Sequence, residues 1–317
     1  MRSSPPSIVG TKRYERTTSS ARHADGRSAA TMVMIEEFAP AKINLDLCIT
    51  GRRPDGLHEL DSLVVFTEFG DRLTMTRDDR LTLVASGPFA AALGAASNNL
   101  VQRAASLLAA HAGCRPAVRI TLVKNIPVAA GIGGGSADAA ATLRGLNRLW
   151  QLGLELPALA ELALELGADL PVCLTSRPTW MRGIGERCDV IPELPELSLL
   201  LVNSRQPLAT GAVFGALGAI GERPRSGPPP IERSALLAWL HDRTNHLELP
   251  AKRLLPQIDL VLARLRAQPG CELARMSGSG ATCFGVFDGA TSLAEAARTF
   301  EQQRPEWWSV PTRAAQG

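Results

Sequence analysis

The sequence predicts an α+β protein with two lobes, and three observations support this fold class. Segments with strand alternation and segments with helical periodicity are mixed along the chain without a strict β-α-β order. The chain has 317 residues, of which 45% are hydrophobic and 21% are charged, an ordinary globular composition for about two domains. A proline break near Pro192 separates a block over 34–190 from a second block over 191–310.

Residues 1–33 form a separate segment that is rich in Ser, Arg, Thr and Pro and has no apolar periodicity. This composition predicts a disordered N-terminal tail that carries no chemistry. An Arg- and Ser-rich start is also typical of a transit peptide, although Glu15 and Asp25 weaken plastid import as an interpretation. A true start at Met32 or Met34 is an equally good interpretation, and we expect a bacterial, cytoplasmic protein.

In the first block, 41–49 is predicted as a strand because Ile43 and Leu45 alternate with Lys42 and Asn44. The further elements expected in the first block are a turn at 51–56, strands at 63–66, 71–75 and 81–84, a helix at 99–112, a strand at 117–124, and helices at 136–150 and 157–166. Those expected in the second block are a strand at 198–202, a loop at 223–230, a helix at 254–267, and strands on both sides of 277–280.

The composition excludes several classes of protein. The net charge of +3 is too small to argue for nucleic acid, and no apolar run is long enough to span a bilayer. Six cysteines are scattered without a Cys-x-x-Cys pair, and five histidines form no metal-spaced pair. We therefore expect buried, reduced thiols, no protein metal site, small-molecule partners, no nucleic acid, no membrane, and a monomer or homodimer.

The most informative segment is a glycine run, in which four glycines fall within Gly131–Gly135, ahead of Ser136 and a helical pattern. Glycines let a ligand approach the backbone, and free N–H groups at a helix N-terminus bind phosphate. Ser136 is the expected N-cap, and Asp138 is expected in the first helical turn. A loop-to-helix junction that binds nothing is the alternative, which the chain entropy of so many glycines disfavours.

Two common phosphate-binding motifs do not fit this run. A Walker A loop needs a lysine directly after its glycines, and none follows here. The dinucleotide fingerprint needs a third glycine where Ser136 stands and an acid about twenty residues further on, where Glu155 lies beyond the helix. A nicotinamide oxidoreductase is therefore a remote alternative.

The segment 127–140 resembles the ATP-binding motif of the GHMP kinase superfamily, to which galactokinase, homoserine kinase and mevalonate kinase belong. The segments 39–45 and 276–284 are similar to its N-terminal and C-terminal motifs. The resemblance implies a two-lobed GHMP kinase-like fold with the active site between the lobes, and ATP with Mg²⁺ as the phosphoryl donor. The ATP-binding residues that it implies are Pro127, Gly131, Gly133, Gly134, Gly135, Ser136 and Ala137.

One group within the superfamily resembles the chain from Phe38 to Phe287. Its members phosphorylate the 2-hydroxyl of a cytidine-diphosphate-linked methylerythritol in the non-mevalonate pathway to isoprenoid precursors. The segments that are similar to the motifs of this group are 39–47, 51–60, 167–173, 182–186 and 245–248. The resemblance implies the same activity here, and the alternatives are another small-molecule kinase such as a homoserine kinase, or a non-catalytic nucleotide- or sugar-binding sensor.

The same resemblance assigns Lys42 and Asp169 as the catalytic pair, in which Asp169 takes the hydroxyl proton and the nearby ammonium keeps it ionised. From the pattern alone, Lys42 is an exposed strand lysine and Asp169 a solvated loop acid. Asp169 also follows the helix end at Gly167, where an acid opposes the helix dipole unless a cation compensates it.

For the phosphoryl acceptor, the resemblance implies contacts at Asn44, Leu57, His58, Thr210 and Phe214. Leu57 stands where the family commonly has a tyrosine, and stacking on a base is worth about 1–3 kcal/mol, so weaker binding of the nucleotide end is expected. A core helix residue is the alternative interpretation of Phe214.

Two further departures from the family pattern affect the site segments. Ala137 replaces a usual serine, from which we expect little loss because Ser136 remains. His246 replaces a usual aspartate, which leaves the local contacts at 245–248 open.

Overall fold

The computed structural model describes residues 33–93, 99–218 and 227–315. The predicted disordered tail lies outside the described residues except for Val33, as does the first half of the predicted loop at 223–230. The described chain from Val33 onward clusters as one compact unit.

The first lobe is built on a seven-stranded sheet with the long strand β3 at its centre. β3 pairs with β1, β2, β5 and β6, and only β4 and β5 run parallel. The strands are β1 (Met34–Asn44), β2 (Cys48–Arg52), β3 (His58–Arg77), β4 (Thr82–Ser86), β5 (Val118–Val123), β6 (Thr179–Gly183) and β7 (Arg187–Val190).

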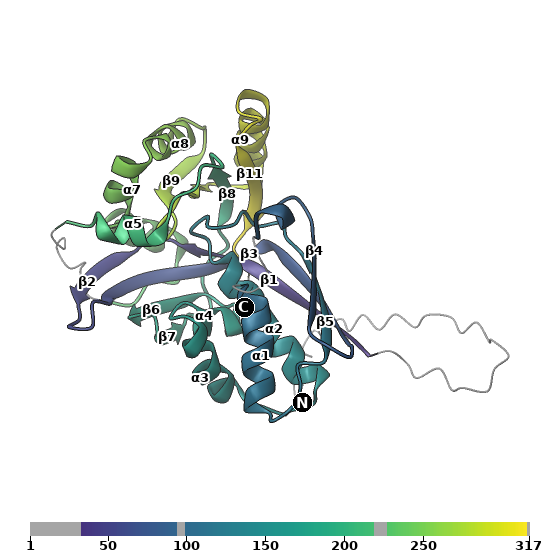
Figure 1. Cartoon of the computed structure of the whole chain (residues 1–317). Coiled ribbons are helices and arrows are strands. Elements are labelled where there is room, and N and C mark those ends of the chain that lie inside the picture. The colour runs from purple at the N-terminus through teal and green to yellow at the C-terminus, as the bar shows by residue number, and fades with distance from the viewer. Residues whose placement is uncertain (1–32, 94–98, 219–226, 316–317) are drawn as a thin grey trace, which may run out of the picture. The chain divides into compact units, whose positions relative to one another are not determined.

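Four helices lie together on one side of β3 (Figure 1) and bury an apolar core against the sheet. They are α1 (Leu100–His111), α2 (Gly134–Leu149), α3 (Leu156–Leu166) and α4 (Leu170–Thr175), and a short 3₁₀ turn, η1, covers Ala90–Leu93. Because α2 packs on β1 and on α1, the position of its N-terminus is set by the core of this lobe.

The second lobe is a four-stranded antiparallel sheet in the order β11-β8-β10-β9 with its own apolar core. Its strands are β8 (Ser198–Asn203), β9 (Cys271–Met276), β10 (Cys283–Phe287) and β11 (Trp308–Arg313). Its helices are α5 (Thr210–Gly215), α6 (Arg233–His241), α7 (Glu248–Leu254), α8 (Gln257–Arg266) and α9 (Ala290–Gln303).

A third core joins the two lobes. Ile43 and Val65 from the first sheet are buried in one cluster with Leu201 and Phe284 from the second. Strand β1 is therefore covered on both faces, which explains why even its polar residues near Asn44 are buried. The α+β, two-lobed fold predicted from the sequence is confirmed.

Several predicted boundaries are wrong. The strand expected over 41–49 is two strands, because the chain leaves the sheet after Asn44 and the Leu47 N–H donates to Thr244 O in the second lobe, 3.0 Å away. The strands expected at 63–66 and 71–75 are one strand, β3. It continues because Gly70 lies against Ala39, where a Cβ would come within 2.3 Å of the carbonyl oxygen.

Other segments also differ from the prediction, which had no elements for β6, β7, α5, α6, α7, α9 and β11. The helix expected over 254–267 is α8, which starts later than predicted, at Gln257, because Leu254 ends α7 and Pro256, which has no N–H, takes the N-cap position. The sequence reading had no element for 170–175, which the structure shows as α4 directly after Asp169.

All six cysteines are free, although not all of them are buried as expected. Cys48, Cys173 and Cys283 are buried, whereas Cys114 is exposed. Burial raises the pKa of the Cys188 thiol to about 11, so this half-buried thiol stays protonated at neutral pH.

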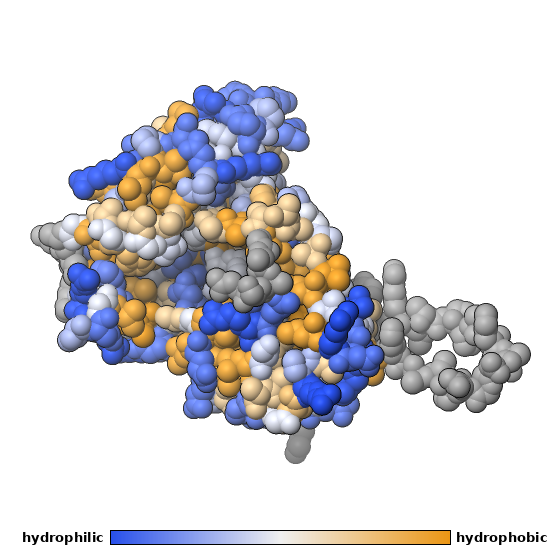
Figure 2. Space-filling model, in the orientation of Figure 1, coloured by the Kyte–Doolittle hydropathy of each residue, from blue (hydrophilic) through white to orange (hydrophobic). Residues whose placement is uncertain are grey.

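The outer surface carries few notable features. Leu249, Leu254 and Leu260 are exposed on α7 and α8, where Figure 2 shows hydrophobic colour on the second lobe. Among the described residues, no helix combines the length and the apolar character that a membrane span requires. The expected monomer or homodimer stays a prediction.

Candidate active site

A cavity of about 750 Å³ lies between the two lobes and gathers residues from both. Lys42, Asp169 and the glycine loop line it from the first lobe, and Phe214 and Ser279 line it from the second. Of the predicted site residues, the cavity is lined by Lys42, Asn44, Leu57, His58, Pro127, Gly131, Gly133, Gly134, Gly135, Ser136, Asp169, Thr210 and Phe214.

Ala137 is the exception among the predicted ATP-binding residues. Its side chain is buried in the core of the first lobe, and its N–H donates to Gly133 O at 2.8 Å within the helix. The Ala137 N–H, which the resemblance implies for phosphate binding, is therefore already hydrogen-bonded within the helix.

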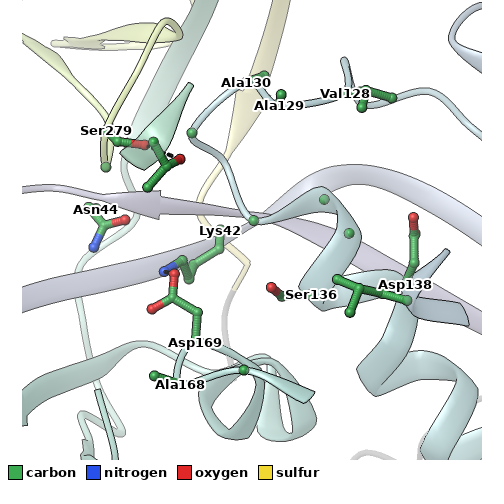
Figure 3. Close-up of a pocket in the computed structure, with 18 of the residues that line it drawn as sticks. Lys42, Asn44, Val128, Ala129, Ala130, Ser136, Asp138, Ala168, Asp169 and Ser279 are labelled. Atoms are coloured by element: carbon green, nitrogen blue, oxygen red, sulfur yellow. Dashed lines mark hydrogen bonds and ion pairs between the residues drawn. The ribbon is translucent and has the colours of Figure 1, made fainter. Parts of the chain in front are cut away.

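Lys42 and Asp169 form a close ion pair, with 2.8 Å between Nζ and Oδ2. The lysine side chain is 3% exposed and the aspartate side chain 48%. Burial lowers the pKa of Lys42, but the charge and hydrogen bond of Asp169, together with Cys173 and Cys188, more than offset burial and the pKa is raised, so the amine stays protonated. Figure 3 shows the two groups facing one another, and the exposed-lysine interpretation is wrong.

Asp169 follows the end of α3, as expected, but it also directly precedes the first residue of α4. The positive end of the short α4 dipole therefore favours its charge, in contrast to the unfavourable dipole expected from the sequence. Together with Lys42, the start of α4 therefore favours negative charge at this position of the cavity wall.

The glycine loop crosses directly over the stem of Lys42. The Lys42 N–H donates to Ile132 O at 3.0 Å, and a Cβ on Gly133 would lie 2.9 Å from Lys42 Cβ. Gly133 also has φ +66°, which side chains rarely adopt. The loop therefore requires glycine here for close packing on the lysine as well as for a turn.

The loop is also held by the second lobe. A Cβ on Gly131 would lie 2.4 Å from Gly280 O, and Ser277 Oγ donates to Gly131 O at 3.2 Å. The Thr282 N–H donates to Ala130 O at 3.1 Å. The two glycine-rich motifs seen in the sequence are thus in contact, and each fixes the conformation of the other.

The start of α2 differs from the prediction. Gly133 occupies the N-cap position and α2 begins at Gly134, so Ser136 is not the N-cap. The N–H groups of residues 134–136 have no acceptor inside the helix, and they lie at the cavity wall, where they can bind an anion. Asp138 is buried beneath this turn and does not lie in the solvated first turn.

The opposite end of the cavity carries the predicted acceptor residues. The rings of His58 and Phe214 lie 5.1 Å apart with a 34° tilt. Burial and the nearby Arg52 lower the pKa of His58, so the ring is neutral at neutral pH. Phe214 packs against the second core, as the core interpretation expects, and it also lines the cavity, so its stacking on a base stays a prediction.

The two polar acceptor residues are held by hydrogen bonds. Asn44 Nδ2 donates to Ser62 Oγ at 2.8 Å, which orients its amide. Thr210 Oγ1 lies 2.8 Å from Ser279 Oγ, so α5 is connected to the second glycine turn. Leu57 lies in the turn between β2 and β3 and is 48% exposed.

The sequence left the local contacts of the segment 245–248 undecided. In the structure, this segment holds backbone next to the cavity through hydrogen bonds. Asn245 Nδ2 donates to the carbonyls of Met276 at 2.8 Å and of Gly278 at 2.7 Å. His246 Nδ1 accepts the Ile49 N–H at 3.0 Å. The histidine therefore supplies an acceptor to the backbone of β2.

Sequence reasoning missed two buried charges next to the cavity. Lys124 donates to Asp71 at 2.5 Å and to Asp138 at 2.7 Å, and Lys124 lines the cavity. The sequence feature that could have indicated this cluster was the lysine that directly follows the strand Val118–Val123, which has buried residues at alternate positions. Among the described residues, no group of three or more acidic, His or Cys side chains could hold a metal ion.

Comparison with known proteins gives consistent results. The model for "GHMP kinases N terminal domain" matches residues 99–177, and the model for "GHMP kinases C terminal" matches residues 229–305. The 4-diphosphocytidyl-2-C-methyl-D-erythritol kinase of Rhodospirillum rubrum is 49% identical over 278 residues, which are 87% of this chain and 91% of the relative. That of Rhizobium etli is 46% identical over 290 residues, 89% of this chain and 96% of the relative.

Solved structures agree. A crystal structure of 4-(cytidine 5'-diphospho)-2C-methyl-D-erythritol kinase is 35% identical with a TM-score of 0.71, and the match covers 89% of this chain and 100% of that one. The homoserine kinase of Cytophaga hutchinsonii matches with a TM-score of 0.66 over 92% of this chain and 97% of that one, but at 17% identity it supports the fold alone.

Proposed function

The chain belongs to the GHMP kinase family and, within it, to the 4-diphosphocytidyl-2-C-methyl-D-erythritol kinases of the MEP pathway to isoprenoid precursors, and we propose how its site performs that reaction. ATP is the donor, and its γ-phosphoryl group goes to the 2-hydroxyl of the substrate named in these relatives. The observation that carries the proposal is the Lys42–Asp169 ion pair in the cavity wall, beside the start of α2.

The chemistry needs a base, a cation and an anion site in one place. Asp169 is half exposed to the cavity, so its carboxylate can accept the proton of the attacking hydroxyl. Lys42 keeps that acid ionised and faces the charge that develops on the transferring phosphoryl group. The free N–H groups at the start of α2 would hold the phosphate oxygens of ATP.

The two ends of the cavity suit the two substrates. His58 and Phe214 would receive the cytosine ring at one end, with Leu57 beside them. The other end is lined by apolar side chains that include Leu100 and Val128, and a purine ring would be placed there. In this arrangement, the methylerythritol hydroxyl and the γ-phosphate meet at Asp169.

Mg²⁺ belongs to this proposal as part of the nucleotide substrate. The described residues offer carboxylates singly to the cavity and build no three-ligand metal cage. That donor set suits a Mg²⁺ ion that arrives on the triphosphate and keeps several waters, since this ion is usually bound through phosphates and one or two carboxylates. The relatives named above are bacterial, which supports a cytoplasmic location as a proposal.

The test is an ADP-release assay with purified protein, ATP and Mg²⁺. The cytidine-diphospho substrate is compared with homoserine, mevalonate and galactose, and Asp169→Asn is the inactive control. We expect turnover with the first substrate only. Turnover with homoserine alone would support the homoserine kinase alternative, and ATP binding without any turnover would support the sensor.

A further inference from the structure

A second charged cluster lies under the glycine loop, apart from the catalytic pair. Lys124 Nζ donates to Asp71 Oδ2 at 2.5 Å and to Asp138 Oδ2 at 2.7 Å, and all three side chains are buried. The cluster joins three elements, since Asp71 is on β3, Lys124 follows β5 and Asp138 is on α2. One ammonium therefore faces two carboxylates that are almost fully buried in and behind the cavity wall.

The two carboxylates have very different surroundings. Asp71 Oδ1 accepts the N–H groups of Asn125 at 2.6 Å and of Ile126 at 2.9 Å, in addition to the lysine bond. Asp138 has only its bond to Lys124, and its Oδ1 is buried without a hydrogen-bond partner. A buried charge is costly unless it is fully hydrogen-bonded. The site thus stabilises one negative charge, and that charge belongs on Asp71.

We propose that Asp71, Lys124 and Asp138 form a positioning triad for the glycine loop, in which Asp71 is ionised and Asp138 is protonated at neutral pH. The triad is then electrically neutral, with one cation, one anion and one carboxylic acid. The proposal deepens the proposed function, because it concerns the loop that would hold the phosphates of ATP.

The contacts show how the triad acts on the loop. Asp71 fixes the backbone at residues 125 and 126, where the chain enters the loop. Asp138 belongs to α2, where the chain leaves the loop, and a Cβ on Gly134 would lie 3.1 Å from Lys124 Nζ. Both ends of the loop are therefore attached to the same ammonium.

Other charges near α2 do not disturb this assignment. On β1, Lys42 is paired with Asp169, and Glu37 is paired with Arg144 and Arg148 further along α2. Arg103 on α1, together with Glu161 and Glu165 on α3, is exposed to solvent, and α4 carries no charged residue.

Electrostatics support the same protonation state. Burial raises the pKa of Asp138 to about 8; Lys124 opposes this rise and the charge of Asp71 adds to it. The unfolded chain releases this proton near the ordinary pKa of 3.8, whereas the folded protein keeps it to about 8. Stability of the wild type should therefore fall as pH rises between these values, because the unfolded state binds fewer protons.

The test compares Asp138→Asn with Asp71→Asn in the full-length protein. An asparagine imitates a protonated aspartate, so Asp138→Asn should match the wild-type melting temperature near pH 4 and exceed it increasingly up to about pH 8. Asp71→Asn removes the carboxylate that holds the charge with two backbone N–H bonds and leaves Lys124 only Asp138, whose Oδ1 has no hydrogen-bond partner, so the melting temperature of this variant should fall at every pH. Its KM for ATP should rise by about tenfold or more, with a much smaller change in KM for the acceptor.

A second measurement locates the proton without using turnover. Infrared difference spectra of Asp138→Asn against the wild type should show the loss of a protonated carboxylic acid band at neutral pH. If Asp71→Asn does not fold, this spectrum and the pH dependence of the Asp138→Asn melting temperature still test whether Asp138 is protonated.

Two results would overturn the proposal. One is a loss of stability in Asp138→Asn as large as that in Asp71→Asn, which would mean that both acids are ionised. The other is the absence of the carboxylic acid band from the wild type. Neither readout depends on catalysis, so failure of the triad is distinguishable from failure of the proposed kinase reaction.

Discussion

Two lysines lie under neighbouring glycines of the same loop, Lys42 below Gly133 and Lys124 below Gly134. Both lysine side chains are buried, and both donate to aspartates at less than 3 Å. They differ in their partners, because Asp169 is 48% exposed whereas the two partners of Lys124 are enclosed. The two centres therefore differ in the exposure of the acid and not in that of the lysine, and only the exposed Asp169 carboxylate is open to accept a proton from a substrate.

The largest effect is expected from removing the base of the exposed pair. Asp169→Asn should lower turnover by about 10²–10⁴-fold, because an amide cannot take the hydroxyl proton. The melting temperature should change little, since the side chain is half exposed. Turnover at saturating substrates and thermal melting measure the two effects.

The matched control is Asp259→Asn, which also removes an exposed acid paired with a lysine, at Lys252, but lies outside the cavity. It should keep wild-type turnover. If a folded Asp169→Asn enzyme also turns over normally, Asp169 is not the base.

Replacing each lysine tests the comparison directly. Lys42→Met should reduce turnover by about 10²–10³-fold, as expected for loss of one group that stabilises developing charge. Its stability should change less than that of Lys124→Met, because water can solvate Asp169 once the lysine is gone.

Lys124→Met leaves the charge of Asp71 buried without its cation, and removing one partner of such a pair costs about 3–5 kcal/mol. Denaturant unfolding of both variants gives the two free energies. Equal losses of stability would mean that acid exposure does not distinguish the two centres.

Glycine substitutions test whether the loop depends on its contact with Lys42. Gly133→Ala should cost about 1–2 kcal/mol for its left-handed backbone alone, and its Cβ would also press on Lys42. Gly113→Ala is the control, because it shares the left-handed backbone with φ +63°, but its Cβ would meet nothing within 4 Å and it lies outside the cavity. ATP-dependent thermal stabilisation should disappear in the first variant and persist in the second. Its survival in Gly133→Ala would mean that the loop does not bind ATP as proposed.

The sequence predicted part of the glycine loop and of the helix that follows it. The glycine run and the helix after it were predicted correctly in kind, because their pattern is local. The helix start was misplaced at Ser136, since serine is a common N-cap and the left-handed geometry of Gly133 is set by packing on Lys42.

Long-range pairs were beyond pattern reasoning. Lys42 and Asp169 are 127 residues apart in the chain, and family resemblance alone predicted that they act together. Lys124 and Asp71, which are 53 residues apart, were not singled out at all. The first pair is made by the packing of β1 and α4 on α2, and the second by the pairing of β5 with β3, which carries Asp71. No local periodicity encodes either arrangement.

The smallest expected effect is at the acceptor end of the cavity, far from both lysines. Leu57→Tyr should lower KM for the cytidine substrate, because a tyrosine ring can stack on a base where leucine offers only apolar contact. The gain should lie near the lower end of the range of about 1–3 kcal/mol for stacking, since Leu57 already provides some burial.

The turn position of Leu57 and its 48% exposure leave room for a larger ring beside His58. KM for ATP should not change, because the glycine loop and its two lysines are untouched. A rise in KM for the cytidine substrate would mean that the site is shaped around leucine and that the ring is overpacked. Unchanged KM values for both substrates would remove Leu57 from the proposed acceptor site.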